Sequence, residues 1–210
     1  ISYNAQYYCP NLNTNIFLQE QKELTIPYTP KFSYEKQCNG NNNFTIDLFD
    51  ETNFYAPVTD RNVSYSYRLS GTPASSAIPI TGTQITNLAA GTYLITQQVS
   101  GNINGVNQPS CSTELTVTLS TMSSGMQIEL VAPINCNNTA VEFTVLFSSL
   151  EYSYEWTFEP GVKSTLRQPK RVFSEPGNYN VSVIVTNDSG CSKTLDLLIT
   201  IPEKCFNGYI

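Results

Sequence analysis

The stretch Pro176-Gly177-Asn178-Tyr179-Asn180-Val181 decides the fold of this 210-residue chain. A glycine turn leads here into a segment in which valines at every second position alternate with polar residues. A period of two predicts a strand with one buried face. Residues 44–48, 141–147 and 195–201 alternate in the same way. Many short alternating segments separated by turn residues are typical of an all-β sandwich.

One order of landmarks occurs twice along the chain. The first copy reads Cys38-Asn39-Gly40, Tyr65-Ser66-Tyr67, Ala90-Gly91-Thr92-Tyr93 and Ser110-Cys111-Ser112. The second copy reads Cys136-Asn137-Asn138, Tyr152-Ser153-Tyr154, Pro176-Gly177-Asn178-Tyr179 and Gly190-Cys191-Ser192. This repeat predicts two modules of one fold, placed end to end. Repeated modules usually serve reach or multivalency rather than chemistry.

The repeat also sets the domain boundaries that we expect. The first module spans 28–120 and the second spans 124–202, with a short linker at 120–125. Residues 1–27 match neither copy and are expected to form an N-terminal arm or an extra strand. Residues 203–210 are expected to start a following segment of a longer protein, because Cys205 stands where a third copy would begin. Within the modules, Asn187–Gly190 predicts a hairpin turn, and Gly101–Gly105 predicts a longer and looser one.

The composition excludes several classes of partner. Only 13% of the residues are charged and the net charge is −6, so the chain has no surplus of Lys and Arg for nucleic acid or anionic membranes. No apolar run approaches the roughly 20 residues of a membrane helix, which predicts no membrane insertion. A hydrophobic fraction of 40% is still enough for a core in each module.

Cysteine usage indicates the compartment. The chain has six cysteines, none in a Cys-x-x-Cys pair, and no histidine, so a zinc site is not expected. An even number of cysteines in a sparsely charged β-rich chain predicts disulfides formed in an oxidising compartment. We therefore expect a secreted or cell-surface protein with no metal and no cofactor.

The second module resembles a PKD domain. The motifs are Trp156-Thr157-Phe158, Gly177-Asn178-Tyr179-Asn180-Val181 and Thr186-Asn187. The resemblance implies an immunoglobulin-like sandwich that serves as a spacer or an adhesive module. The acidic Gly-Asp-Gly turn of that family is replaced here by Glu159-Pro160-Gly161, so properties tied to that turn are not carried over.

The first module is similar to the repeats of large Bacteroidetes surface adhesins, including those linked to gliding motility. The similarity lies in Leu88-Ala89-Ala90-Gly91-Thr92-Tyr93 and in Ser110-Cys111, with Ser110 where those repeats have glycine. It implies a role at the cell surface.

Three aromatic residues are predicted to be structural. Trp156 lies at mid-sandwich and is expected to be the largest core side chain. Tyr93 and Tyr179 each follow a glycine turn by two residues, which suits a tyrosine corner with the hydroxyl tied to nearby backbone. The alternative is an aromatic platform for a ligand.

Two disulfide schemes remain open. In the first, each module closes on itself through Cys38–Cys111 and Cys136–Cys191. In an immunoglobulin-like topology, however, the paired positions of that scheme lie at opposite poles, about 23 Å apart along a seven-residue strand. The second scheme joins the modules through Cys38–Cys191 and closes the ends through Cys9–Cys111 and Cys136–Cys205. A different strand order, or pairing of Cys205 with a further module, would change it.

Other candidate sites are weak. Without histidine the usual catalytic triads are absent, and no catalytic residues are assigned. Asp47, Asp50 and Glu51 cluster as carboxylates, either as a calcium site or as a solvated face. Lys163, Arg167, Lys170 and Arg171 form a basic string, either a docking site for an acidic partner or, more commonly, a solvated loop. Five glycosylation sequons start at Asn43, Asn62, Asn137, Asn180 and Asn187, and we interpret them as chance in an Asn-rich and Thr-rich chain.

The sequence thus predicts a non-enzymatic extracellular stalk or adhesion module of a long bacterial surface protein. Its partners would be neighbouring modules of the same chain and a surface protein or glycan that the sequence does not identify. The alternatives are an accessory module of a secreted hydrolase, acting as a spacer or in glycan binding, and a glycosylated eukaryotic ectodomain.

Overall fold

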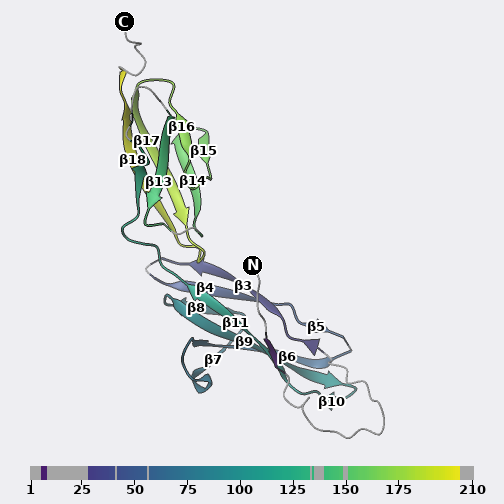
Figure 1. The fold of residues 1–210 in the computed structure, drawn as a ribbon. Coiled ribbons are helices and arrows are strands. Elements are labelled where there is room, and N and C mark those ends of the chain that lie inside the picture. Colours follow the sequence, from purple (N-terminus) through teal and green to yellow (C-terminus); the bar gives the residue numbers. More distant parts are fainter. Residues whose placement is uncertain are drawn as a thin grey trace. The chain divides into compact units, whose positions relative to one another are not determined.

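The computed structural model describes residues 6–8, 28–40, 42–55, 57–132, 134, 140–148 and 151–203. The chain divides into two compact units, Ile1–Leu119 and Ser120–Ile210. In the described ranges the regular structure is β, apart from one short 3-10 turn at Ala74–Ser76 (Figure 1). The all-β class predicted from the alternating segments is therefore confirmed. No helix among these residues has the length and hydropathy needed to span a bilayer.

The described residues of the first unit form three sheets. Its strands are β1 (Gln6–Tyr8), β2 (Tyr28–Thr29), β3 (Phe32–Cys38), β4 (Phe44–Asp50), β5 (Asn53–Phe54), β6 (Thr59–Leu69), β7 (Ile78–Ile80), β8 (Gln84–Leu88), β9 (Gly91–Ile103), β10 (Val106–Asn107) and β11 (Cys111–Leu119). The main sheet has the order β1-β11-β9-β6-β7, with β10 paired to β9. A second sheet has the order β3-β4-β8, and β2 pairs with β5.

The second unit contains two sheets. Its strands are β12 (Gln127–Leu130), β13 (Ala140–Leu146), β14 (Ser153–Glu159), β15 (Val162–Ser164), β16 (Lys170–Val172), β17 (Gly177–Thr186) and β18 (Ser192–Ile201). One sheet has the order β12-β13-β16 and the other has the order β15-β14-β17-β18.

The two units share one strand order. The series β11-β9-β6-β7 in the first unit corresponds to β18-β17-β14-β15 in the second, and β3-β4-β8 corresponds to β12-β13-β16. The repeated landmarks occupy equivalent places, because the two glycine turns open β9 and β17 and the two later cysteines stand at the start of β11 and just before β18. The sequence repeat thus marks a repeat of topology.

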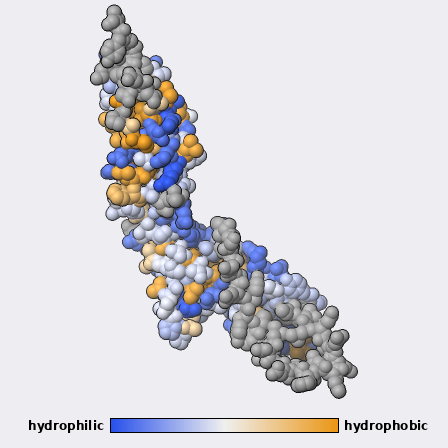
Figure 2. All heavy atoms as spheres, in the orientation of Figure 1, coloured by the Kyte–Doolittle hydropathy of each residue, from blue (hydrophilic) through white to orange (hydrophobic). Residues whose placement is uncertain are grey.

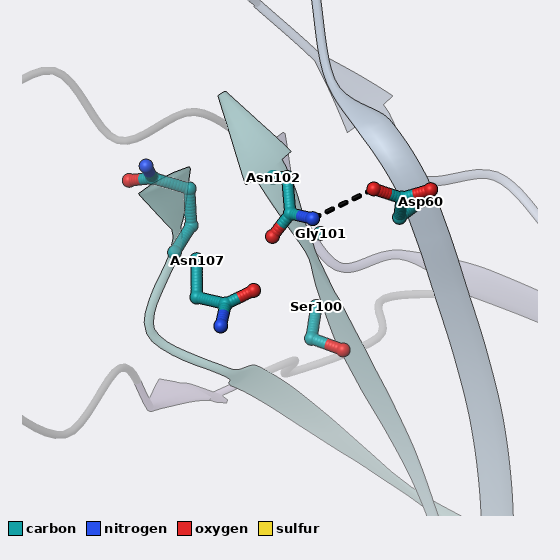
Figure 3. A pocket seen from close by; sticks show the side chains of 6 residues that line it. Asp60, Ser100, Gly101, Asn102 and Asn107 are labelled. Atoms are coloured by element: carbon teal, nitrogen blue, oxygen red, sulfur yellow. Dashed lines mark hydrogen bonds between the residues drawn. The ribbon is translucent and has the colours of Figure 1, made fainter. Parts of the chain in front are cut away.

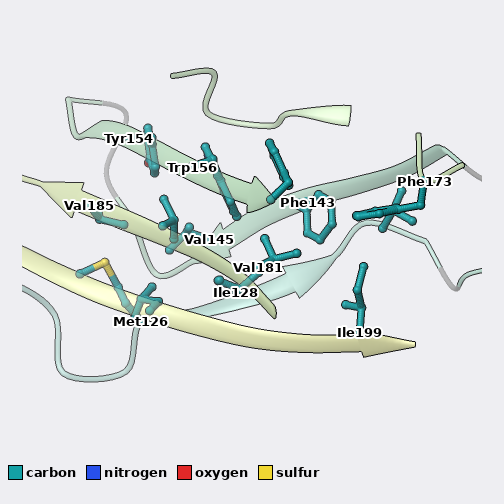
Figure 4. Close-up of a cluster of buried hydrophobic side chains, with 14 of the residues drawn as sticks. Met126, Ile128, Phe143, Val145, Tyr154, Trp156, Phe173, Val181, Val185 and Ile199 are labelled. Atoms are coloured by element: carbon teal, nitrogen blue, oxygen red, sulfur yellow. The ribbon is translucent and has the colours of Figure 1, made fainter. Parts of the chain in front are cut away.

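The core of the second unit lies between its two sheets (Figure 4). Trp156 is fully buried on β14, where it stacks parallel to Phe158 at a centroid distance of 6.1 Å. It also meets Phe143 of the facing sheet at 5.9 Å. Alternating valines of β17 complete the cluster. Contact between inward side chains of two sheets is the packing of a β-sandwich.

The core of the first unit carries a polar link between its sheets. Phe32 of β3 contacts Tyr65 of β6 edge to face, with ring centroids 5.6 Å apart. Beside them Gln97 of β9 is fully buried, and its Nε2 donates to Asp50 Oδ1 at 2.8 Å and to the Tyr65 hydroxyl at 3.2 Å. A buried amide needs such partners, since an unmet donor costs about 1–3 kcal/mol.

The loose hairpin expected at residues 101–105 is a tight turn. Residues 101–105 do not form a loose hairpin, because β9 continues to Ile103 and pairs directly with Val106. Asn104 and Gly105 form the turn alone, with φ of 51° and 78°. Positive φ at both central residues matches the twist of the flanking strands, which favours this tight turn.

The expected linker at 120–125 is also partly wrong. Ser120 belongs to the second unit, where its backbone N–H donates to Ser189 Oγ at 2.9 Å and its carbonyl accepts from Asn187 Nδ2 at 2.7 Å. Met122 packs against the core of the same unit. At the other end of the chain, Gln6–Tyr8 of the expected arm adds a strand, β1, beside β11.

Candidate functional site

Trp156 lies inside the second unit and presents no aromatic face to solvent. Its exposed fraction is 0%, and its Nε1 donates to the carbonyl of Leu166 at 2.9 Å. Burial with the indole N–H paired is the usual state of a core tryptophan. The alternative of an aromatic ligand platform is therefore not supported at this residue.

Tyr93 and Tyr179 share one hydrogen-bond geometry. The Tyr93 hydroxyl donates to the carbonyl of Ala89 at 3.0 Å, and the Tyr179 hydroxyl donates to the carbonyl of Glu175 at 2.9 Å. Each bond spans the glycine turn that opens the strand, which is what a tyrosine corner requires. Both tyrosines thus fix the entry of the chain into a central strand.

The described cysteines are all bonded. Cys38, Cys111 and Cys191 are disulfide-bonded, and no described cysteine is a free thiol. Cys9, Cys136 and Cys205 lie outside the described residues, so the pairings assigned to them stay predictions.

The first unit itself separates Cys38 from Cys111. Lys36, two residues before Cys38, donates its Nζ to the carbonyl of Thr118 at 3.4 Å, near the end of β11. Cys111 is the first residue of that strand, seven residues away from Thr118, which corresponds to about 23 Å along a strand. The Cα atoms of a disulfide lie within roughly 7 Å. This separation along β11 argues against the scheme in which the first module closes on itself.

The carboxylates of β4 are occupied by neighbouring donors. Asp47 accepts from Gln37 Nε2 at 2.6 Å and from Gln84 Nε2 at 2.7 Å. Glu51 pairs with Lys31 at 2.7 Å, and that hydrogen bond lowers the pKa of the Glu51 carboxyl. Asp50 is exposed, and its Oδ1 accepts from Gln97 Nε2 and from Thr52. No group of metal-ligating side chains occurs in the described ranges.

The basic string of the second unit is largely neutralised. Lys163 pairs with Glu155 at 2.6 Å, Lys170 with Glu142 at 3.1 Å, and Arg171 with Glu159 at 3.2 Å. Because three of its four cations face carboxylates, the string presents little net positive charge to an acidic partner.

The sequons differ in accessibility. Asn187 is 5% exposed and Ser189 is fully buried, so the folded protein offers no acceptor there. Asn62 and Asn180 are exposed. Asn43 donates to Asn87 Oδ1 at 3.1 Å, and Asn137 lies outside the described residues.

A face that the sequence analysis did not single out carries two open pockets. It is the outward face of the main sheet of the first unit. The pocket nearer β7 has about 340 Å³ and is lined by Ser64, Tyr65, Ser66, Pro79, Ile80, Thr96, Gln98 and Ser112. The other has about 250 Å³ and is lined by Asp60, Ser100, Gly101, Asn102, Asn107 and Gln108. We call this face the polar track.

The polar track follows β9. Outward residues at every second position, Thr96 and Gln98 in one pocket and Ser100 and Asn102 in the other, form one row. Ser64 of β6 and Ser112 of β11 flank Gln98 on either side in the strand register. The row therefore runs for about 20 Å along one strand.

A β-bulge shapes the far end of the track. The β6–β9 register shifts between Thr59 and Asn62, so Asp60 and Arg61 together face Gly101. Asp60 takes a φ of 48°, and its Oδ2 accepts from Asn102 Nδ2 at 2.7 Å, as Figure 3 shows. Bulges of this kind re-aim a side chain, and here the bulge turns a carboxylate toward the pocket.

Gly101 is required by the same bulge. A Cβ at this position would lie 2.4 Å from Val58 Cγ1 and 3.1 Å from the Thr59 carbonyl oxygen. Arg61, the second bulge residue, stacks over the Phe54 ring at 4.3 Å and donates to the Val58 carbonyl. The Arg61 guanidinium thus contacts Phe54 and Val58 and does not pair with Asp60. The glycine and the polar residues at every second position were the sequence signals for this site, but only strand register brings them together.

Comparison with known proteins supports the assignment of the second unit. Residues 127–201 match the family model of the PKD domain. No curated protein matches the chain. The family match begins with β12 and ends with β18, so it covers the two sheets of the second unit. The second unit is therefore a PKD-like module.

Proposed function

We propose that the chain is a non-enzymatic stalk or adhesion module of a bacterial cell-surface adhesin. The PKD match at residues 127–201 carries this proposal, because PKD domains are generally non-catalytic structural modules of the extracellular adhesion or spacer type. The first unit repeats the same strand order. Repetition of one module suits reach, or weak contacts that add up through avidity.

The finer assignment rests on the first module. Its Leu88–Tyr93 motif is similar to repeats of Bacteroidetes adhesins, and we extend the proposal to an adhesin of that kind, with gliding motility as one setting. The expected partners are neighbouring modules and a ligand on a surface.

The proposed role is helped by a covalent joint. We assign Cys38–Cys191 across the two units and Cys9–Cys111 and Cys136–Cys205 at the ends. Two observations support this scheme: Cys38 and Cys191 are both disulfide-bonded, and Lys36, close to Cys38, contacts the end of β11 opposite to Cys111. A stiffened joint would suit a module that holds a binding part at a distance.

Location on intact cells tests the proposal. Antibodies against the purified chain are applied to cells of the source organism before and after treatment with proteinase K. We expect labelling of intact cells that the protease removes. Labelling only after permeabilisation would contradict a cell-surface role.

The second candidate is an accessory glycan-binding module of a secreted hydrolase, which the polar track would serve as well as it would serve an adhesin. A eukaryotic ectodomain would instead carry sugar at the exposed Asn62 or Asn180. Intact mass of the native protein distinguishes this case, since each attached glycan adds mass that a peptide glycosidase removes.

A further inference from the structure

We propose that the polar track of the first unit binds a neutral oligosaccharide in an extended conformation along β9. The inference deepens the proposed function, because it gives the adhesion module a ligand class. The binding itself is a property of the purified chain, so it can be tested apart from the location of the protein.

The donors and acceptors of the track match sugar hydroxyls. Serine and threonine hydroxyls and the amides of Gln98, Asn102 and Asn107 each both donate and accept, as sugar hydroxyls do. Among the described residues, Gln98 and Asn107 have no side-chain hydrogen bond, and Asn102 donates its amide to Asp60 while its oxygen faces the pocket side (Figure 3). These groups are therefore available to a ligand that replaces water.

The charge of the track favours a neutral ligand. At one end Arg68 pairs with Glu114 at 3.4 Å, and Glu114 also accepts from Thr96 at 3.3 Å. At the other end Asp60 is the charged group that lines the pocket. No cation lines either pocket, so an anionic ligand would lack a partner and would face the Asp60 carboxylate at one end.

The remaining lining supplies an apolar wall. Pro79 and Ile80 of β7 border the pocket that contains Gln98, and such a wall suits the C–H face of a sugar ring. Protein interfaces are instead enriched in aromatic residues, Met and Arg and depleted in Ser. The lining of the track, rich in serine and in side-chain amides, thus favours a glycan over a protein partner.

The bulge at Asp60 is an independent observation. A non-glycine residue with positive φ is uncommon, and such strain clusters at ligand sites. Here Asp60 is the residue with positive φ, and its carboxylate accepts from Asn102 at the end of the row near the bulge. The carboxylate and the amide together can bind two neighbouring hydroxyls of a sugar. The other described surfaces lack this combination of a pocket, a row of polar side chains and a residue with positive φ. Figure 2 shows apolar side chains at the surface of the second unit. Ile184 of β17 and Leu198 of β18 are exposed, but neither lines one of the two pockets.

Titration by NMR tests the proposal on the full chain. The probes are cellotetraose, xylotetraose, mannotetraose and chitotetraose at millimolar concentrations, with tetragalacturonate as the charged counterpart. We expect amide shifts confined to β6, β7, β9, β10 and β11 for at least one neutral probe, and weaker binding of tetragalacturonate. Absence of shifts with all four neutral probes, or tighter binding of the charged probe, would overturn the proposal.

Two substitutions test the extent of the track. Gln98→Ala acts in one pocket and Asn107→Ala in the other, and each removes an exposed amide. We expect each to weaken binding roughly tenfold, the effect of losing one or two hydrogen bonds. Gln127→Ala removes an exposed amide from β12 in the second unit and should leave binding unchanged. An effect at one pocket alone, or equal effects of all three variants, would contradict a ligand that spans the row.

Discussion

Asn187 is the residue whose side chain holds the β17–β18 turn in shape. Its Oδ1 accepts from the backbone N–H groups of Ser189 and Cys191 at 3.0 and 2.9 Å, and its Nδ2 donates to the carbonyl of Ser120 at 2.7 Å. An Asn in a turn commonly replaces missing backbone partners in this way. Here the same side chain also anchors the start of the second unit.

Asn187→Ala should therefore be strongly destabilising. It leaves two buried N–H groups and the half-buried Ser120 carbonyl without these partners, and we expect the free energy of unfolding to fall by about 2–4 kcal/mol. Asn187→Asp keeps both acceptor bonds and loses only the bond to Ser120, so it should cost less. Urea unfolding followed by the fluorescence of Trp156, the one tryptophan of the chain, measures both. Equal losses for the two variants would contradict the role of the turn bonds.

Tyr179→Phe tests the tyrosine corner of the second unit. The substitution removes the hydroxyl bond to Glu175 and keeps the ring against Phe173, 4.4 Å away. We expect a loss of about 1 kcal/mol in the same urea experiment, the usual net value of one hydrogen bond.

The control for Tyr179→Phe is Thr194→Val, which removes an exposed hydroxyl from β18. This change should stay within about 0.5 kcal/mol of the wild type. If both variants unfold at the same urea concentration, the corner bond contributes nothing measurable.

At the scale of residues, the sequence predicted best those positions whose place in the fold is fixed by a local pattern. The glycine turns before Tyr93 and Tyr179 define the corner positions, and alternation with valines places Trp156 inside. Gln97 shows the limit, since no local pattern indicates that a glutamine will link two sheets. Its partners, Asp50 and Tyr65, lie 47 and 32 residues away in the chain.

At the scale of elements, the bulge between β6 and β9 depends on Gly101. The side chain of alanine would overlap Val58 and approach the Thr59 carbonyl. We expect Gly101→Ala to destabilise the first unit by about 1–3 kcal/mol, the usual cost of overpacking. Thermal unfolding followed by circular dichroism measures the change.

Gly125→Ala is the matched control for this bulge. The nearest atom to its added Cβ is Phe147 Cδ2 at 3.8 Å, which is ordinary contact. This variant should unfold within about 0.5 kcal/mol of the wild type. A loss at Gly125 as large as that at Gly101 would show that general strand effects, and not the bulge, decide the outcome.

Element boundaries were harder to predict than element type. Residues 101–105 contain two glycines, which the sequence alone did not distinguish from a loose loop. The structure resolves the ambiguity through pairing, because Ile103 and Val106 close the ladder around a two-residue turn. Bulge and turn positions depend on the register of strands distant in sequence, and local composition does not contain that register.

At the scale of the whole molecule, buried tyrosines set a limit on alkaline stability. Burial raises the pKa of Tyr28, Tyr65 and Tyr93 above the ordinary value. The unfolded chain therefore loses these protons first, and their stabilisation is present below about pH 10 and is lost as pH rises through the folded pKa values.

Stability measured between pH 8 and pH 11 tests this linkage. We expect the urea midpoint of the first unit, followed by circular dichroism, to fall above pH 10 and to fall less steeply in Tyr65→Phe. Tyr55→Phe is the control, because that side chain is 64% exposed, and it should follow the wild type. A midpoint independent of pH up to 11 would contradict the prediction.

The repeat was the feature of the whole chain that the sequence predicted best. The tyrosine, glycine-turn and later cysteine landmarks lie at equivalent places in both units, whereas Cys136-Asn137-Asn138 lies outside the described residues. The polar track was not anticipated, because its residues come from β6, β9, β10 and β11 and share a face only after the sheet forms. The pairing of the six cysteines is equally hard to predict from the sequence, because their spacing alone is compatible with many connectivities.

Disulfide mapping under non-reducing conditions tests the central claim, a covalently braced extracellular module. Cleavage with trypsin and a glutamate-specific protease leaves each cysteine on its own peptide, with Cys38 on 37–51, Cys111 on 69–114 and Cys191 on 172–193. We predict that mass spectrometry finds 37–51 linked to 172–193. A link between 37–51 and 69–114, or free thiols at these cysteines, would contradict the account.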